Sequence, residues 1–185
     1  TGLAIAINTT MYSVLDALIN PKMDMREPER LLGFGYFGDM KQLVPQAEKN
    51  EMIRGLSFHE GVTGSRMANE RVVEANGVLL PVTVLSVPSN YFHVLGLRPN
   101  AGRLLTAVDQ AERPIVISRR LWKQLFPDDA FSPRKLVVQG TRRVVVGLLG
   151  AAALPGRSTD IWQIASPEEL DLTSLGLARL KPGVA

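Results

Sequence analysis

The stretch SVPSNYFHVLGLRPNAGR, residues 86–103, decides how the chain turns between its β-rich parts. Ser89 or Asn90 can cap a short helix, which carries an apolar cluster at Tyr91, Phe92, Val94 and Leu95. Gly96 can end this helix in the left-handed conformation, and Arg98-Pro99 forces an extended exit. We therefore expect a strand to enter, a buried corner helix to turn the chain, and an extended segment to leave after a second bend at Gly102-Arg103.

Strand and turn signals surround this corner. Residues 71–75 and 78–87 flank Asn76-Gly77, a favoured two-residue hairpin turn, and residues 135–139 and 142–149 flank Gly140-Thr141 in the same way. Residues 114–118 read as a short buried strand, and Ser118 can cap a helix with a core stripe at Leu121, Trp122, Leu125 and Phe126. Residues 106–113 read as a polar loop, 160–164 as a strand, and 166–169 as the start of a brief helical turn.

The two ends of the chain predict a different unit. Strands are expected at residues 31–37, 52–62 and 175–180, with a helix at 39–50. The sequence therefore predicts an α+β protein with two lobes, in which a small strand-helix-strand lobe, residues 21–61 plus 171–185, holds an inserted β-rich lobe, residues 62–170.

The N-terminal segment, residues 1–20, is apolar on every side at residues 2–7 and then amphipathic. Its helical stripe contains Met11, Val14, Leu15, Leu18 and Ile19 and ends at Asn20-Pro21. Either a surface helix packed on its own domain or the outer end of a transmembrane stalk explains this pattern. No run reaches the roughly 18 apolar residues of a membrane span, and no signal peptide is visible. Because the chain begins with Thr, we expect it to be a fragment of a longer protein.

Composition narrows the function. The 185 residues contain no cysteine, which excludes disulfide scaffolds and thiol chemistry. The net charge is +3, and the Arg119-Arg120 and Arg142-Arg143 pairs are too sparse for the basic stripe of a nucleic-acid-binding protein. We expect no nucleic acid among the partners.

Candidate chemical groups are few. His59 and His93 are the only histidines, and the sequence has no Gly-x-Ser-x-Gly nucleophile elbow that could form a catalytic triad with either of them. The more common interpretation is two structural histidines. Gly33, Gly35 and Gly38 form a Gly-x-Gly-x-x-Gly string, but inside a strand, where close packing explains it better than dinucleotide binding. Nothing selects a catalytic pair among the loop acids Asp109, Glu112, Asp128 and Asp129. Arg98 and Arg103 flank the corner and are expected to brace backbone carbonyls rather than to bind an anion. We expect no catalytic, cofactor-binding or metal-binding residue, and not an enzyme.

Several motifs together resemble the MacB-type periplasmic core domain of bacterial ABC-transporter permeases. Besides SNYFHVLG and PNAGR at the corner, they stand in the family's order at 8–18 (NTTMYSVLDAL), 28–31 (PERL), 117–122 (ISRRLW) with Phe126, 144–147 (VVVG), 160–162 (DIW) and 179–184 (RLKPGV). The family resemblance implies a porter-like, membrane-proximal lobe with a second lobe inserted into it. In the family another helix and strand follow the last motif, so this small lobe is expected to be incomplete.

The resemblance also implies a function. Such permeases sit in the inner membrane with this domain facing the periplasm or cell exterior, and they couple cytoplasmic ATP hydrolysis to mechanical work or efflux. The implied partners are an ABC ATPase domain or subunit, a periplasmic adaptor or lipoprotein, the membrane through flanking helices, and a second permease copy. Two alternatives remain: a stand-alone module that binds a peptide or lipid in a groove between lobes, and an enzyme whose site the sequence hides.

Overall fold

The structure is a computed structural model that describes residues 25–35, 57–65, 68–75, 77–127, 130–150, 159–166, 169 and 175–184. The predicted N-terminal helix and stripe, the helix at 39–50, Gly38, Asp128, Asp129 and the strand prediction for 52–56 lie outside these residues.

The described part is a mixed α/β structure, mostly strands, with two short α-helices. The helices are α3 (Tyr91–Leu95) and α4 (Arg119–Leu125), and two 3-10 turns are η1 (Pro28–Arg30) and η3 (Ala107–Gln110). The strands are β1 (Leu31–Gly35), β2 (His59–Ser65), β3 (Asn69–Ala75), β4 (Val78–Val87), β5 (Ala101–Gly102), β6 (Ile115–Ser118), β7 (Arg134–Val138), β8 (Thr141–Leu149), β9 (Ile161–Ile164) and β10 (Leu175–Leu180).

Within the described residues these strands form two sheets. The larger has the order β5-β8-β6-β9-β4-β3-β7, and a further pairing of β7 with β8 closes six of its strands into a barrel. The smaller sheet has the antiparallel order β1-β10-β2. The sequence predicted a β-rich middle but not its closure, because closure depends on which distant strands pair rather than on local patterns.

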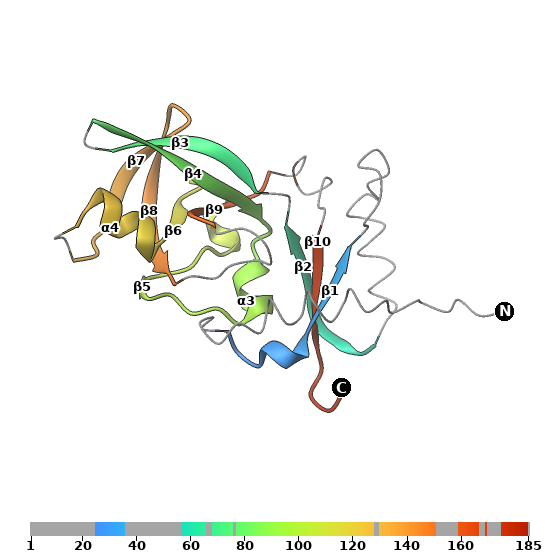
Figure 1. Cartoon of the computed structure of the whole chain (residues 1–185). Coiled ribbons are helices and arrows are strands. Elements are labelled where there is room, and N and C mark those ends of the chain that lie inside the picture. Colours follow the sequence, from blue (N-terminus) through green and yellow to red (C-terminus); the bar gives the residue numbers. More distant parts are fainter. Residues whose placement is uncertain are drawn as a thin grey trace.

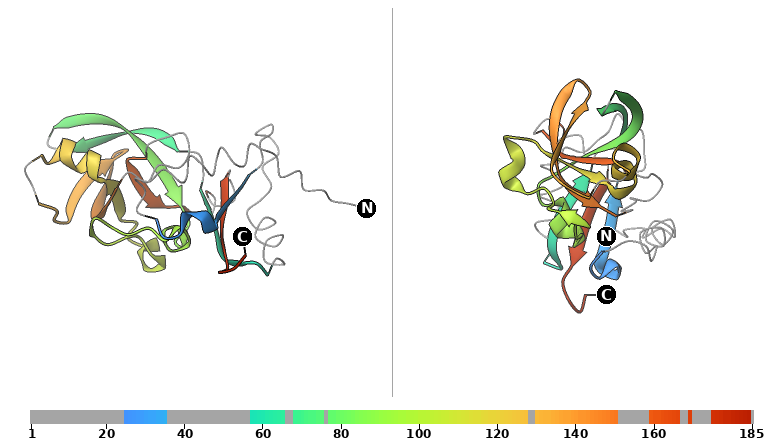
Figure 2. Two further views of the ribbon diagram at one scale, coloured as in Figure 1. Left: turned by 60° about the horizontal axis from the view of Figure 1, so that its bottom comes forward. Right: turned by 90° about the vertical axis from the view of Figure 1, so that its left-hand side faces the viewer.

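Each sheet draws on a different part of the chain. The three-stranded sheet takes β1 and β2 from the first third and β10 from the end, whereas the barrel strands all lie between residues 69 and 164. Figure 1 and the turned views of Figure 2 show the two sheets next to each other, with α3 at their boundary.

The barrel wall has two buried faces. Along β6, Ile115 and Ile117 point into the barrel core, where they pack with α4, while Val116 points the other way into a second cluster around α3. Strand β4 divides similarly, with Val82 and Val84 in the first cluster and Leu85 and Val87 in the second. Two covered faces explain why residues 115–117 read as an unbroken apolar run instead of alternating.

Local predictions mostly agree with the structure, and the differences have physical causes. Strand β4, strand β10 and the hairpin that joins β3 to β4 are confirmed, since Ala75 pairs with Val78. The second hairpin turns one residue earlier than predicted, at Gln139-Gly140, because Val138 pairs with Thr141. Both turn residues have positive φ, at 50° and 73°, a conformation that suits Gly and penalises β-branched Thr.

Two further predictions need correction, and a third agrees with the structure. Residues 107–110 form η3 inside the predicted polar loop, because Thr106 and Asp109 make a reciprocal capping box. Ser57 and Phe58, inside the strand predicted at 52–62, lie in a turn, and β2 runs from His59 to Ser65. Ser166 and Glu169 bond each other as in a capping box, in agreement with the predicted helical turn at 166–169.

Candidate functional site

Helix α3 and its flanks form the boundary between the barrel and the three-stranded sheet, and we call this region the joint. Its buried cluster takes Leu31 and Leu177 from the three-stranded sheet, and Tyr91, Phe92 and Leu95 from α3. The barrel side adds Leu85, Val87, Leu105, Val116, Leu149, Trp162 and Ile164. One continuous apolar cluster therefore contacts both sheets. The binding-module alternative requires a groove between two lobes. Among the described residues, this apolar cluster packs at that boundary.

Asn90 begins α3 but does not cap it, contrary to the prediction. Its side-chain Nδ2 donates to the Val62 carbonyl at 2.8 Å, and its Oδ1 accepts from the Thr63 hydroxyl at 3.0 Å. Both partners lie on β2 of the three-stranded sheet. The amide that sequence reasoning assigned to its own helix thus connects that helix to the other sheet.

Arg179 of β10 makes the corresponding connection at the end of α3. Its Nε donates to the Val94 carbonyl at 2.6 Å, and its Nη1 donates to the Glu27 carbonyl at 3.3 Å. The residue is only 4% exposed, and its Nη2 is buried without a hydrogen-bond partner among the described residues. Burial lowers the pKa of this guanidinium, and the nearby positive charges of Arg30 and Arg26 add to the effect. Arg179 therefore stabilises the joint through carbonyl groups rather than through an ion pair.

The segment before β1 completes the joint. Met25 forms an isolated antiparallel bridge with Leu97, and the Arg26 N–H donates to the Gly96 carbonyl at 3.3 Å. Gly96 adopts the predicted left-handed conformation, with φ 65°. A Cβ built on Gly96 would lie 2.8 Å from the Arg26 Cβ and 3.2 Å from Arg179 Nη2, so the close approach also requires glycine.

Charged groups surround Arg179 at the surface of the joint. Arg30 bonds the carboxylates of Glu27 and Glu60 and donates from Nε to the Leu180 carbonyl at 3.0 Å. The Arg30 bond lowers the pKa of Glu27. This network ties η1 to β2 and β10 of the three-stranded sheet.

The candidate chemical groups from the sequence lie on different elements of the structure. His59 is half-buried in β2 and His93 is exposed on α3. Gly33 and Gly35 lie inside a strand, β1, as predicted. Glu112 is exposed, whereas Asp109 is buried. In the part of the chain that the structure describes, no three His, Cys, Asp or Glu side chains gather as metal ligands would.

The arginines that flank the corner differ from expectation. Arg98 is exposed, and the structure gives it no hydrogen bond or ion pair among the described residues. Arg103 binds mainly a carboxylate, with both Nη atoms 2.7 Å from the two Asp109 oxygens, and its carbonyl contact, to Leu104, is longer at 3.3 Å. The prediction of carbonyl bracing was therefore wrong for the principal partner of Arg103. This bond lowers the pKa of Asp109, helped by the Thr106 N–H.

Sequence reasoning missed Asn90 as a contact between sheets, and it placed Arg179 in the 179–184 motif without predicting its buried contacts to α3. A signal for Arg179 existed, because Leu177 and Arg179 lie two apart in the strand LGLARL and so share a face. A charged residue on the buried face of an apolar strand needs partners in the protein. No comparable signal exists for Asn90, since its cap position is the ordinary place for Asn.

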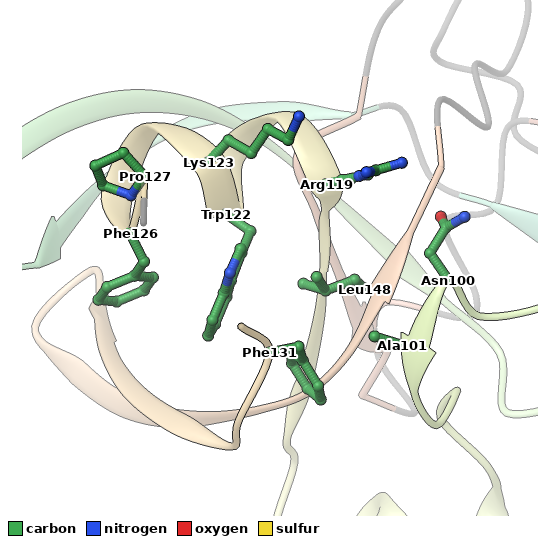
Figure 3. Close-up of a pocket in the computed structure, with 9 residues that line it drawn as sticks. All are labelled: Asn100, Ala101, Arg119, Trp122, Lys123, Phe126, Pro127, Phe131 and Leu148. Atoms are coloured by element: carbon green, nitrogen blue, oxygen red, sulfur yellow. The ribbon is translucent and has the colours of Figure 1, made fainter. Parts of the chain in front are cut away.

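A second feature is a cavity of about 350 Å³ beside α4, shown in Figure 3. It is lined by Asn100, Ala101, Arg119, Trp122, Lys123, Phe126, Pro127, Phe131 and Leu148. Trp122 and Phe126 also belong to the barrel core, as the sequence predicted. The cavity is thus a feature of the barrel and not of the joint.

Comparisons with known proteins agree on one family. The model of the MacB-like periplasmic core domain matches residues 2–178. The structure is similar to the periplasmic region of MacB from Actinobacillus actinomycetemcomitans, with TM-score 0.64 and 16% identity over 84% of this chain and 76% of that one. The extracellular domain of the noncanonic ABC-type transporter YknZ from Gram-positive bacteria gives TM-score 0.61 and 16% identity over 82% and 83% of the chains.

A third structure, a domain of a putative permease protein from Porphyromonas gingivalis, gives TM-score 0.53 and 16% identity over 73% of this chain and 62% of that one. At these identities the structural likeness shows the fold alone. No curated protein sequence matches the chain significantly. No helix within the described ranges has the length and apolar character needed to cross a membrane.

Proposed function

Because the chain belongs to the MacB-like periplasmic core domain family, and is the periplasmic or extracellular domain of an ABC-transporter permease, we propose that it transmits motion as a rigid lever. In this proposal, ATP hydrolysis on a cytoplasmic ATPase domain or subunit moves the membrane helices that flank the chain. The three-stranded sheet receives this movement, and the barrel performs mechanical work outside the membrane on a substrate, an adaptor or a lipoprotein. A second permease copy completes the proposed assembly.

The joint is the observation that carries the proposal. Helix α3 belongs in sequence to the barrel, yet Asn90 bonds β2 and Val94 bonds Arg179 of β10. The apolar cluster is continuous across the boundary, and close-packed protein interiors transmit displacement with little compression. A helix fixed to both sheets by its two ends is suited to carry force from one sheet to the other.

We also propose the division of the chain into parts. Residues 1–20 form the end of a membrane or stalk helix, residues 21–61 plus 171–185 the membrane-proximal lobe, and residues 62–170 the inserted lobe. The separate origins of the two sheets in the sequence support this division, but β2 continues to Ser65 and so places the first junction after that residue. Limited proteolysis of the chain is expected to cut just after residue 65, near residue 170, or within 150–159, before it cuts within 71–149. Equal cleavage throughout 71–149 would contradict a compact inserted lobe.

Loosening the joint tests the lever in the complete transporter, reconstituted so that ATP hydrolysis and export are both measured. Arg179→Lys removes the guanidinium fork that reaches two carbonyl groups. We expect export to fall much further than ATP hydrolysis, because force is generated but poorly transmitted. Leu136→Ala, in the barrel core, is the control, since it destabilises the barrel away from the joint and should lower both activities in parallel.

Locking the joint gives the opposite test. A Cβ built on Gly61 of β2 would lie 3.1 Å from Val94 Cγ2, so Gly61→Cys with Val94→Cys places two sulfurs at disulfide distance. The chain itself has no cysteine, so this bond forms without competition inside it. A rigid lever keeps its transport activity when oxidised. Loss of transport on oxidation that returns on reduction would show that the joint bends during the cycle, and would overturn the lever.

A further inference from the structure

The cavity beside α4 has an aromatic wall with fixed geometry. The Trp122 ring lies between Phe126 and Phe131, with ring centroids 4.7 Å and 5.2 Å away. Trp122 and Phe126 are buried among the barrel core residues, and Phe131 packs against the same core. These rings therefore present a preformed apolar surface to the cavity, which lowers the cost of ordering this wall on binding.

Two cations stand at the edge of this wall. Arg119 and Lys123 lie four residues apart on α4, so they share one face of the helix, and both line the cavity. Their neighbour Arg120 instead bonds the buried carboxylate of Asp160 at 2.5 Å. Among the described residues, Arg119 and Lys123 have no carboxylate partner. Arg120 thus stabilises the barrel, whereas Arg119 and Lys123 line the cavity.

The surrounding sequence has the same charge. Between residues 69 and 166 there are 12 Lys and Arg but 7 Asp and Glu, a net charge of +5, although the whole chain carries only +3. An acidic partner would be attracted to this part of the molecule before contact. Figure 1 shows α4 at the end of the barrel that lies away from the three-stranded sheet.

We propose that this cavity binds an acidic peptide segment of a protein partner, which inserts an aromatic side chain against the Trp122–Phe131 wall and places an adjacent carboxylate on Arg119 and Lys123. The volume, about 350 Å³, is at the lower end of the range for ligand pockets and suits one or two side chains. Guanidinium and ammonium groups recognise carboxylates through charge-assisted hydrogen bonds. Because Asn100 and the two cations interrupt the apolar lining, the cavity does not suit a continuous acyl chain. This site stands independently of the lever proposed for the joint.

Binding of short peptides to the 185-residue chain tests the proposal. The probe is acetyl-Glu-Phe-Asp-amide, and the measurement is NMR of the two tryptophan indole groups. We expect the Trp122 signal to move during the titration, while Trp162, buried in the cluster at the joint, stays in place as an internal reference. Acetyl-Gln-Phe-Asn-amide, without charge, and acetyl-Glu-Ala-Asp-amide, without the ring, should each bind about tenfold more weakly.

A matched pair of double variants identifies the cations. Arg119→Gln with Lys123→Gln is expected to weaken the probe about tenfold. Lys135→Gln with Arg142→Gln removes the same charge from exposed positions on β7 and β8 and should change affinity less than about twofold. The Trp122 chemical shift of each unliganded variant shows whether the cavity is intact.

Three outcomes would overturn the proposal. The Trp122 signal could remain still at millimolar peptide concentrations, or both double variants could weaken binding equally, which would indicate attraction by net charge alone. Alternatively, vesicles of phosphatidylglycerol could bind through Arg119 and Lys123 while the peptide does not, which would assign the surface to lipid.

Discussion

Helices α3 and α4 are both short and both pack apolar side chains onto barrel strands, but their polar groups are used differently. In α4, Ser118 caps the helix, since its hydroxyl accepts from the Leu121 N–H at 3.0 Å. In α3, Asn90 occupies the same N-cap position, but its side chain bonds Val62 and Thr63 of β2 instead of the helix. The polar contacts of α4 lie within the barrel, whereas those of α3 cross to the three-stranded sheet.

The two helix ends differ in the same way. Strand β6 leads straight into α4, and Asp160 at the start of β9 fixes this corner within the barrel by accepting from Ser118 and Arg120. The end of α3 is instead fixed by Arg179 and by the chain before β1. The joint is therefore distinguished by polar groups whose partners lie in another sheet. Exposed cations in contrast mark α4 as a surface element.

The largest expected effect is at the apolar centre of the joint. Phe92 is buried in the cluster shared by both sheets and meets Tyr91 edge to face, with centroids 5.4 Å apart. Phe92→Ala should lower the free energy of unfolding by about 3–5 kcal/mol, measured by urea denaturation. Val108→Ala, at a position 84% exposed, is the control and should change it by less than about 0.5 kcal/mol. A loss below about 1 kcal/mol for Phe92→Ala would show that the joint is loosely packed.

Alanine substitutions at two glycines distinguish the cost of backbone strain from the cost of close packing. Gly140 and Gly96 both have positive φ, at 73° and 65°, but nothing lies within 4 Å of a Cβ on Gly140, whereas Arg26 is 2.8 Å from one on Gly96. Gly140→Ala should cost about 1–2 kcal/mol through strain alone. Gly96→Ala should cost about 1–3 kcal/mol more, because Arg26 and the buried Arg179 must shift. Equal losses in thermal or urea denaturation would contradict the tight contact at the joint.

Asn90→Asp distinguishes a helix cap from a contact between sheets. Asp caps as well as Asn does, so the cap interpretation predicts no loss. In the joint, however, the substitution removes the donor to the Val62 carbonyl and places a carboxylate oxygen near that carbonyl. Because Asn90 is exposed, we expect a loss of about 0.5–1.5 kcal/mol at neutral pH. Unchanged stability in urea denaturation would mean that the bonds of Asn90 to β2 contribute little.

Much of the fold could be predicted from local patterns, and the reasons are physical. The strand and turn residues of 71–87 define a hairpin, Ser118 and the apolar stripe after it define α4, and Gly96 defines the end of α3. Each of these depends on residues a few positions apart. The barrel closure through β7 and β8 and the parallel pairs of β4 with β9 and β6 with β8 could not be predicted in this way, since they join distant segments.

The joint was predictable only in part. The apolar residues of α3 were expected to be buried, but nothing local distinguishes burial against one sheet from burial against two. Asn90 and Arg103 were assigned to nearby backbone groups, which are the ordinary partners of such side chains, and their main contacts proved to be Thr63, Val62 and Asp109. The cavity beside α4 was read as core, because side chains that line a cavity and side chains that fill one have the same spacing in sequence.

The smallest expected effect on stability is at Asp109, which lies in η3 beyond the segment that follows α3. The bidentate bond from Arg103 lowers the pKa of this buried carboxyl, with help from the Thr106 N–H. A lowered pKa in the folded state means that the stabilisation is fully present above the ordinary Asp value, about pH 4, and is lost as the pH falls through the folded pKa.

Asp109→Asn should therefore reduce stability at pH 7 by at most about 1 kcal/mol, because Arg103 is half exposed and water screens the pair. The difference between the two proteins should remain constant down to about pH 5 and shrink below it, as the wild-type carboxyl becomes protonated. Urea denaturation at a series of pH values measures this difference, and Glu112→Gln, which removes an exposed acid from the same loop, is the control. A difference that grows toward acid pH would contradict the lowered pKa, and with it the interpretation that Arg103 and Asp109 together hold the chain where it leaves the joint.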